Sequence, residues 1–185
     1  MSMLAPTPGQ TVGPFFGYAL PFVGGAELVP AGHPQAIRLH GTVFDGAGLP
    51  VPDALIELWQ ADENGQVPQA EGSRARDGWT FTGFGRTPVD DTGRYSFTTL
   101  RPGPADPHRA PFFLLTVFAR GLLHRLFTRA YLPMDNDAVT ADPLLSTVPE
   151  ERRSTLFVRP DEHGFVFDIR LQGPEETVFV EYGVH

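Results

Sequence analysis

The stretch Ile37-Arg38-Leu39-His40-Gly41-Thr42-Val43-Phe44, followed by the turn dipeptide Asp45-Gly46, decides the fold class of this chain. Apolar and polar side chains alternate along it, which is typical of a β-strand with one face in a core. Similar short patterns recur along the chain, separated by turns rich in Gly, Pro and Asp. We expect further strands at residues 54–60, 95–100, 112–118, 124–132, 165–171 and 177–181. Many short strands of this kind predict an all-β fold, a β-sandwich.

Three stretches depart from this alternation. Residues 112–118 form a continuous apolar run, which predicts a strand that is buried on both faces. Residues 147–153 carry the only helical signal that we find, and they predict about two turns in a connection. Residues 1–35 and 61–78 are long and irregular, and loops of that length are usually functional or disordered. We therefore expect a β-sandwich domain over residues 36–185, preceded by an N-terminal arm over residues 1–35.

The composition excludes several classes of function. The 185 residues suffice for one domain, and the absence of Cys excludes disulfide scaffolds, zinc–thiolate sites, iron–sulfur clusters and cysteine nucleophiles. The net charge is −8 and all 14 basic residues are Arg, so we expect no nucleic-acid partner. The longest apolar run, residues 111–119, is too short to span a bilayer, and the N-terminus does not resemble a signal peptide. We expect a cytoplasmic protein with no membrane association.

Spacing motifs for catalysis are absent from the sequence. None of the six His residues forms an H-x-H or H-x₃-H pair, which would place two ligands near one ion. There is no G-x-S-x-G nucleophile elbow, and the paired carboxylates lie in turns or at a helix start. Residue spacing alone therefore predicts a soluble all-β domain without an active site of its own.

Several segments together resemble the intradiol ring-cleavage dioxygenases, which are β-sandwich enzymes that use non-haem Fe(III). Residues 41–45 (GTVFD), 52–62 (PDALIELWQAD), 93–97 (GRYSF) and 101–104 (RPGP) resemble the core of that family. The resemblance extends over nearly the whole chain through residues 7–15 (TPGQTVGPF), 118–122 (FARGL), 127–132 (FTRAYL) and 167–173 (FDIRLQG). These segments indicate the branch of the family that is built from two homologous subunits, α and β.

The resemblance also implies where iron ligands would stand. The iron-holding chains of this branch use two Tyr and two His, and three of those positions correspond here to Ala105, Phe112 and Leu114. The fourth falls in residues 61–78, which contain no Tyr. Fe(III) is a hard cation that prefers phenolate and imidazole ligands, and these three side chains offer it no lone pair. The resemblance thus implies that this chain has no metal ligands or catalytic residues of its own, and that the homologous catalytic β subunit holds Fe(III).

A role in the partner's active site follows from the same resemblance. It implies that Thr11, Gly13 and Pro14 lie beside the substrate and that Arg129 approaches it from the strand. The substrate implied is 3,4-dihydroxybenzoate (protocatechuate), which the complex would cleave with O₂ to 3-carboxy-cis,cis-muconate in aromatic catabolism. A guanidinium group suits the substrate's carboxylate because it binds carboxylates through charge-assisted hydrogen bonds. We expect this chain to be inactive alone and to function in a higher (αβ)n assembly.

Two alternatives stay open at this point. One is a self-sufficient, homomeric intradiol dioxygenase with rearranged iron ligands, which iron in the isolated chain would support. The other is a non-enzymatic, transthyretin-like binding module, which stable monomeric behaviour without a β-type partner would support.

Overall fold

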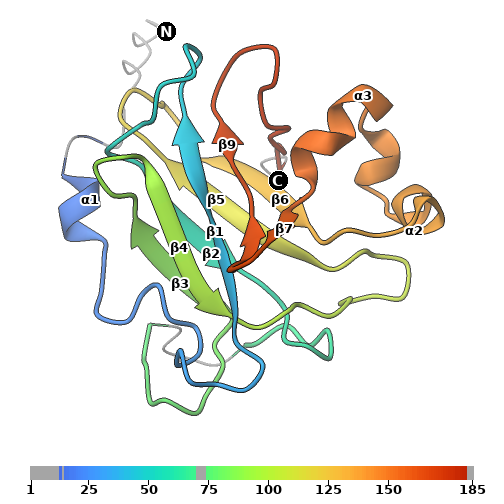
Figure 1. Cartoon of the computed structure of the whole chain (residues 1–185), viewed down its shortest axis with the longest axis horizontal. Helices are drawn as coiled ribbons and strands as arrows, with labels where there is room; N and C mark the ends of the chain where they lie inside the picture. Colours follow the sequence, from blue (N-terminus) through green and yellow to red (C-terminus); the bar gives the residue numbers. More distant parts are fainter. Residues whose placement is uncertain (1–12, 14, 70–73, 183–185) are drawn as a thin grey trace, which may run out of the picture.

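The computed structural model describes residue 13 and residues 15–69 and 74–182, which form two sheets packed face to face (Figure 1). One sheet has the order β4-β1-β8-β7, with β9 also beside β1: β1 (Ile37–Phe44), β4 (Arg94–Thr99), β7 (Arg159–Asp161), β8 (Gly164–Val166) and β9 (Ile169–Arg170). The other has the order β3-β2-β5-β6: β2 (Leu55–Trp59), β3 (Phe84–Pro88), β5 (Phe112–Phe118) and β6 (Leu126–Tyr131). The all-β sandwich expected from the sequence is confirmed.

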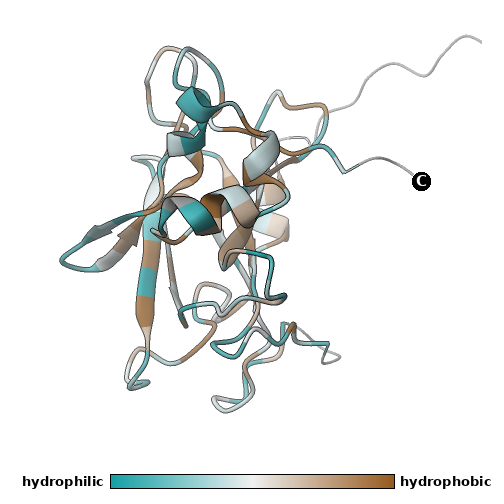
Figure 2. Ribbon diagram, turned by 90° about the vertical axis from the view of Figure 1, so that its right-hand side faces the viewer, coloured by the Kyte–Doolittle hydropathy of each residue, from teal (hydrophilic) through white to brown (hydrophobic). Residues whose placement is uncertain are grey.

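The alternation in each strand places one set of side chains between the sheets. In β1 the buried positions are Leu39, Gly41 and Val43, and Figure 2 shows strands that change from hydrophilic to hydrophobic along their length. The neighbouring strands contribute buried apolar side chains to the same core: Tyr95, Phe97, Ile56, Leu58, Phe113, Leu115 and Val117. Removing so much apolar surface from water is the main force that holds the two sheets together.

Strand β5 is less buried than its composition predicts. Phe113, Leu115 and Val117 face the core and are inaccessible to solvent, whereas Phe112 and Leu114 on the other face are half-buried. The expectation of burial on both faces was therefore only partly right. The outer face of this strand is the floor of the site described below.

The segment at residues 165–171 is interrupted where a single strand was expected. β8 and β9 both run parallel to β1, but Phe167 and Asp168 lie between them outside either strand. The Asp168 carboxylate accepts a hydrogen bond of 3.0 Å from the backbone N–H of Thr42. A side chain thus accepts at a position where a backbone carbonyl would accept in a continuous strand pair.

Residues 177–181 run beside β6 but form no strand. The backbone N–H of Val180 donates to the carbonyl of Phe127, at 2.7 Å. The carbonyl of Val178 accepts instead from the Thr128 side-chain hydroxyl, at 2.8 Å, which takes the place of a backbone donor.

Short helices fill the connections on two sides of the sandwich. They are α1 (Phe16–Ala19), α2 (Asn136–Ala141), the 3₁₀ helix η1 (Leu145–Thr147), α3 (Glu150–Arg153) and the 3₁₀ helix η2 (Ser154–Leu156). α1 lies on the opposite side of the sandwich from α2 and α3 (Figure 1). The expected helical turns near residues 147–153 are present as η1 and α3, whereas α2, β3 and β7 were not expected. Asp135 is the N-cap residue of α2, and its carboxylate accepts a hydrogen bond from the backbone N–H of Ala138.

A second, smaller core lies under α2, η1 and η2. Its buried residues are Ala110, Tyr131, Val139, Leu145, Val148 and Leu156. In the part of the chain that the structure describes, no helix has the length and apolar character needed to cross a bilayer.

Candidate functional site

The three positions that the resemblance assigns to iron ligands line one small pocket. Ala105, Phe112 and Leu114 form part of its wall, together with Trp59, Gln60, Ala61, Val67, Pro68, Gly103, Ala110 and Pro111. Its volume is about 160 Å³. Phe112 and Leu114 reach it because they are two residues apart on β5 and therefore share the outer face of the sheet. Residues distant in sequence thus meet at one place.

Among the lining residues that the structure describes, Gln60 is the one whose side chain carries an oxygen atom, and its amide is already occupied. Its Nε2 donates to the carbonyl oxygens of Leu100, at 2.9 Å, and Ala61, at 3.1 Å. Its Oε1 accepts from the Thr99 hydroxyl at 2.6 Å. The amide is therefore engaged on both of its atoms, and the other lining side chains carry no oxygen or imidazole nitrogen that could bind a hard cation.

The residues of this pocket do not fit the Fe(III) that the family uses. The resemblance assigns imidazole ligands to the positions of Phe112 and Leu114 and a phenolate to that of Ala105, and the side chains present at these three positions carry neither group. No group of three or more His, Asp or Glu side chains within the described ranges could hold a metal ion instead. We therefore assign no metal-dependent step to this chain.

Arg129 lies next to the pocket on β6. The strand pairing places it opposite Leu114, and its guanidinium carbon is 4.3 Å from the centre of the Phe112 ring. Its Nη1 donates to the hydroxyl of Tyr131 at 3.2 Å. Burial acts to lower the pKa of Arg129, but the hydroxyl groups of Tyr131 and Tyr182 outweigh this effect, and the pKa is raised. Arg129 therefore presents a permanent positive charge at the edge of an apolar pocket.

The other predicted substrate-binding residues lie near the N-terminus. Thr11 and Pro14 are outside the residues that the structure describes. Gly13 has a φ of +76°, a conformation that glycine adopts without steric cost, and an added Cβ would have no atom within 4 Å. The positive φ thus accounts for glycine at this position. Gly13 is not among the residues that line the pocket.

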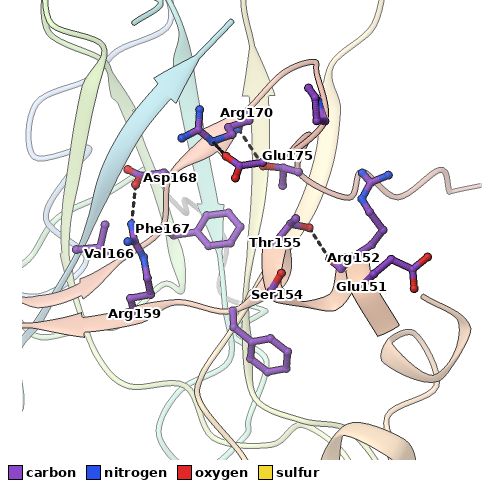
Figure 3. A pocket seen from close by; sticks show the side chains of 13 residues that line it. Glu151, Arg152, Ser154, Thr155, Arg159, Val166, Phe167, Asp168, Arg170 and Glu175 are labelled. Atoms are coloured by element: carbon purple, nitrogen blue, oxygen red, sulfur yellow. Dashed lines mark hydrogen bonds and ion pairs between the residues drawn. The ribbon is translucent and has the colours of Figure 1, made fainter. Parts of the chain in front are cut away.

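A larger, polar pocket of about 400 Å³ lies between η2 and the strands β7 to β9 (Figure 3). Its charges compensate one another. Arg159 pairs with Asp168 at 2.7 Å, and Arg170 pairs with Glu175 at 3.3 Å. This pocket therefore offers no excess charge that would select an ionic ligand.

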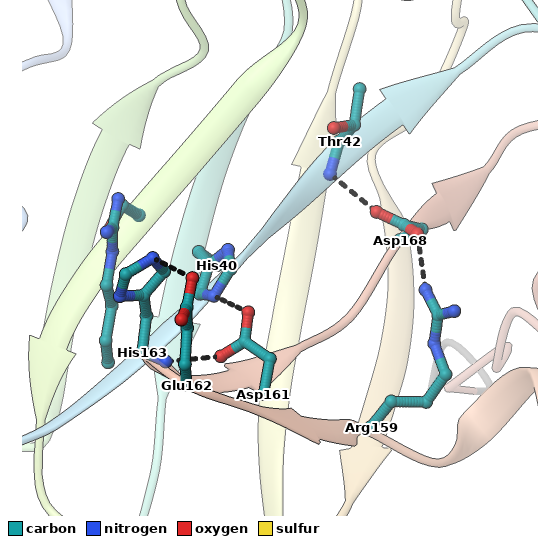
Figure 4. A network of polar contacts seen from close by, with 9 residues as sticks. His40, Thr42, Arg159, Asp161, Glu162, His163 and Asp168 are labelled. Carbon is teal, nitrogen blue, oxygen red and sulfur yellow. Dashed lines mark hydrogen bonds and ion pairs between the residues drawn. The ribbon is translucent and has the colours of Figure 1, made fainter.

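The histidines nearest to one another do not form a metal site. The ring centres of His40 and His163 are 6.4 Å apart, and each imidazole contacts a different carboxylate (Figure 4). His40 contacts Asp161 at 3.0 Å, and His163 contacts Glu162 at 3.2 Å. His108 is exposed.

Tyr131 and Asp142 are residues of the site that the sequence did not single out for such a role. Tyr131 is fully buried in the second core. No sequence pattern pointed to Asp142, because the helix α2 that it follows was not expected. A buried carboxylate near an arginine becomes evident only when the chain is folded.

The similarity of this chain to known proteins agrees with the fold. A family described as Dioxygenase matches residues 13–173. The chain is 39% identical to the protocatechuate 3,4-dioxygenase alpha chain of Burkholderia cepacia, over 98% of this chain and 100% of that protein. It is 33% identical to the protocatechuate 3,4-dioxygenase beta chain of Burkholderia cepacia, over 77% of this chain and 67% of that protein.

A solved structure supports the same assignment. The dioxygenase domain of a dioxygenase carbohydrate-binding fusion protein from Streptomyces sp. SirexAA-E superposes with a TM-score of 0.60 at 28% identity. The match covers 91% of this chain and 99% of that domain. The expected family is confirmed: the chain belongs to the intradiol ring-cleavage dioxygenases.

Proposed function

We propose that this chain is the α-type subunit of a protocatechuate 3,4-dioxygenase and that a homologous β chain holds the Fe(III). The apolar pocket formed by Ala105, Phe112 and Leu114 carries this proposal, because it replaces the ligand set of an iron enzyme with side chains that cannot bind the metal. Full-length similarity to a protein named as an alpha chain supports the same assignment.

The complex would cleave 3,4-dihydroxybenzoate with O₂. The carbon–carbon bond between the two hydroxylated carbons breaks, and both oxygen atoms of O₂ enter the product, 3-carboxy-cis,cis-muconate. The metal chemistry of this reaction belongs to the partner chain. The residues of this chain contribute substrate binding and the exclusion of water.

Arg129 is the residue of this chain best suited to bind the substrate's carboxylate. Its positive charge stands at the edge of an apolar surface, where an ionic contact is screened less than in bulk water. Thr11, Gly13 and Pro14 would line the same substrate site from residues 1–35, the arm that also contributes to the subunit interface.

Exposed apolar side chains near the N-terminus support the interface. Phe15 is 73% exposed, Tyr18 is 88% exposed and Val23 is 98% exposed. Exposed apolar side chains are costly to leave in water, and a surface that carries several large ones is often covered by another protein. The proposed occupant is the β chain, in an assembly of several αβ pairs.

The proposal is tested by purifying the chain alone and after co-expression with a β-type chain. Iron per chain, the visible spectrum and O₂ consumption with 3,4-dihydroxybenzoate are measured for both preparations. We expect the lone chain to be colourless and inactive. The complex should be red, from tyrosinate-to-Fe(III) charge transfer in the β chain, and active. Near-stoichiometric iron in the lone chain would overturn the proposal and favour a homomeric dioxygenase.

A further inference from the structure

A buried carboxylate stands behind the arginine of the site. Asp142 is inaccessible to solvent and lies directly after α2. Its side chain accepts hydrogen bonds from the backbone N–H groups of Ala110 (3.1 Å), Leu144 (2.9 Å) and Leu145 (3.0 Å). It also accepts from the hydroxyl of Tyr131, at 3.2 Å. Four donors thus hold this side chain in one orientation, and burying its oxygen atoms without such partners would be costly.

Tyr131 connects this carboxylate to Arg129. Burial is the main cause that raises the pKa of Tyr131 to about 12, so the hydroxyl keeps its proton at neutral pH. Because the proton is directed to Asp142, the hydroxyl oxygen is free to accept from Nη1 of Arg129. The three groups therefore form a directional chain from the buried carboxylate to the guanidinium.

The ring of Phe112 holds the guanidinium from a second direction. The strand register places Phe112 opposite Tyr131, with ring centres 5.6 Å apart, and Arg129 lies over the Phe112 ring at 4.3 Å. A cation at this distance over an aromatic face is attracted to it. Leu at this position would fill space but would offer no such attraction. The residue that replaces an iron ligand therefore supports the arginine of the site.

We propose that Phe112, Tyr131 and Asp142 are positioning residues, which hold the Arg129 guanidinium in one orientation for the carboxylate of an aromatic acid. This inference rests on the proposed function of Arg129. A long, flexible side chain loses less conformational entropy on binding when it is already ordered. Loosening Arg129 should therefore weaken recognition of the carboxylate and leave the chemical step unchanged.

The first experiment measures the order of Arg129 without reference to activity. The Nη–H signals of the Arg129 guanidinium are assigned by NMR in the full chain, from their loss in Arg129→Lys, and their hydrogen exchange with water is recorded. We expect Tyr131→Phe to speed this exchange about tenfold, because one hydrogen bond to the guanidinium is lost. Tyr95→Phe is the matched control, since it also removes a buried hydroxyl that donates one hydrogen bond, but from the other sheet. It should leave the exchange unchanged.

The second experiment measures recognition in the complex with the β chain. Tyr131→Phe should raise KM for 3,4-dihydroxybenzoate, and the inhibition constant of 4-hydroxybenzoate, by roughly 3- to 10-fold. The values of kcat and of the inhibition constant for phenol, which lacks the carboxylate, should change less than twofold. Phe112→Leu should act in the same direction, and Tyr95→Phe should have neither effect. A purely structural role would change phenol and 4-hydroxybenzoate alike.

The outcomes separate this inference from the proposed function. If Arg129→Lys raises KM but Tyr131→Phe and Phe112→Leu do not, the positioning role is wrong and the function of Arg129 stands. If Arg129→Lys itself leaves KM unchanged, the proposed role of Arg129 fails and the positioning role fails with it. If hydrogen exchange of Arg129 is unchanged in Tyr131→Phe, Tyr131 does not position the guanidinium, and the positioning role is wrong.

Discussion

The hydroxyl of Tyr95 donates a 2.6 Å hydrogen bond to the backbone carbonyl of Phe167, across the sheet that contains β1. Tyr95 lies on β4 and Phe167 lies between β8 and β9, on the other side of β1. The bond therefore passes over the middle of β1, where the residue is Gly41. An added Cβ at Gly41 would lie 1.9 Å from the carbonyl oxygen of Phe167.

Gly41→Ala should consequently be among the most destabilising single changes in the chain. The clash is with backbone, which cannot move without breaking the pairing of the C-terminal segment with β1. We expect the free energy of unfolding in urea to fall by more than about 3 kcal/mol. Gly17→Ala is the matched control, because a Cβ there would meet nothing within 4 Å, and it should be neutral or slightly stabilising. Equal effects of the two changes would contradict this account.

Asp142→Ala should also destabilise the fold, through buried donors rather than through a clash. Four hydrogen-bond donors would lose their acceptor. We expect a loss of about 2–4 kcal/mol in the free energy of unfolding. Asp137→Ala, at an exposed aspartate in the first turn of α2, should cost less than about 1 kcal/mol. A comparably small effect of Asp142→Ala would show that these donors find other partners.

A metal site should be recoverable in the apolar pocket. The triple variant Ala105→Tyr, Phe112→His, Leu114→His supplies one phenolate and two imidazoles around one small volume. We expect this variant to bind Fe(III) and to develop a visible charge-transfer band, and we expect no such band from the parent chain. Replacing Ala105→Tyr by Ala105→Phe keeps the bulk without the phenolate and should abolish the band. A colourless triple variant would mean that the three positions do not converge closely enough to share an ion.

The N-terminal surface should contribute to binding of the β chain. The paired change Tyr18→Ser with Val23→Ser removes two exposed apolar side chains and should weaken the complex about tenfold or more. Affinity is measured by calorimetry or by the concentration dependence of assembly. Leu49→Ser is the control, because Leu49 is also apolar and 63% exposed but lies in the turn between β1 and β2. An equal loss with Leu49→Ser would place the interface elsewhere.

Asp161 should stabilise the fold at neutral pH and lose this contribution at acid pH. Burial acts to raise its pKa, but the backbone N–H of His163 and the His40 side chain outweigh this effect, and the pKa is lowered. A carboxyl with a lowered pKa in the folded state stabilises above its ordinary pKa, near 4, and this contribution disappears as pH falls through the lowered value. The difference in unfolding free energy between the parent and Asp161→Asn should therefore shrink below about pH 4. A difference that grows as the pH falls would contradict the assigned direction.

The β-sandwich could be predicted because its signals are local. β1 and β4 alternate between buried and less buried residues over most of their length, and burial of one face requires that alternation. β3, β7 and α2 were missed because they are short and their own residues form no clear period. Residues 177–181 were expected to be a strand, and this was wrong. The Thr128 hydroxyl on β6 donates to the carbonyl of Val178, which in a β-ladder would accept from a backbone N–H.

The sequence by itself determined which chemical groups stand at the three pocket positions. Ala105, Phe112 and Leu114 have no lone pair for a hard cation, and this follows from their covalent structure in any fold. Tertiary structure alone decided which residues are neighbours of those positions. Antiparallel pairing of β5 with β6 brings Phe112 beside Tyr131, and the packing of α2 brings Asp142 behind them. These contacts join residues that are distant in the sequence, and they depend on hydrogen bonds and burial that exist only once both sheets have formed.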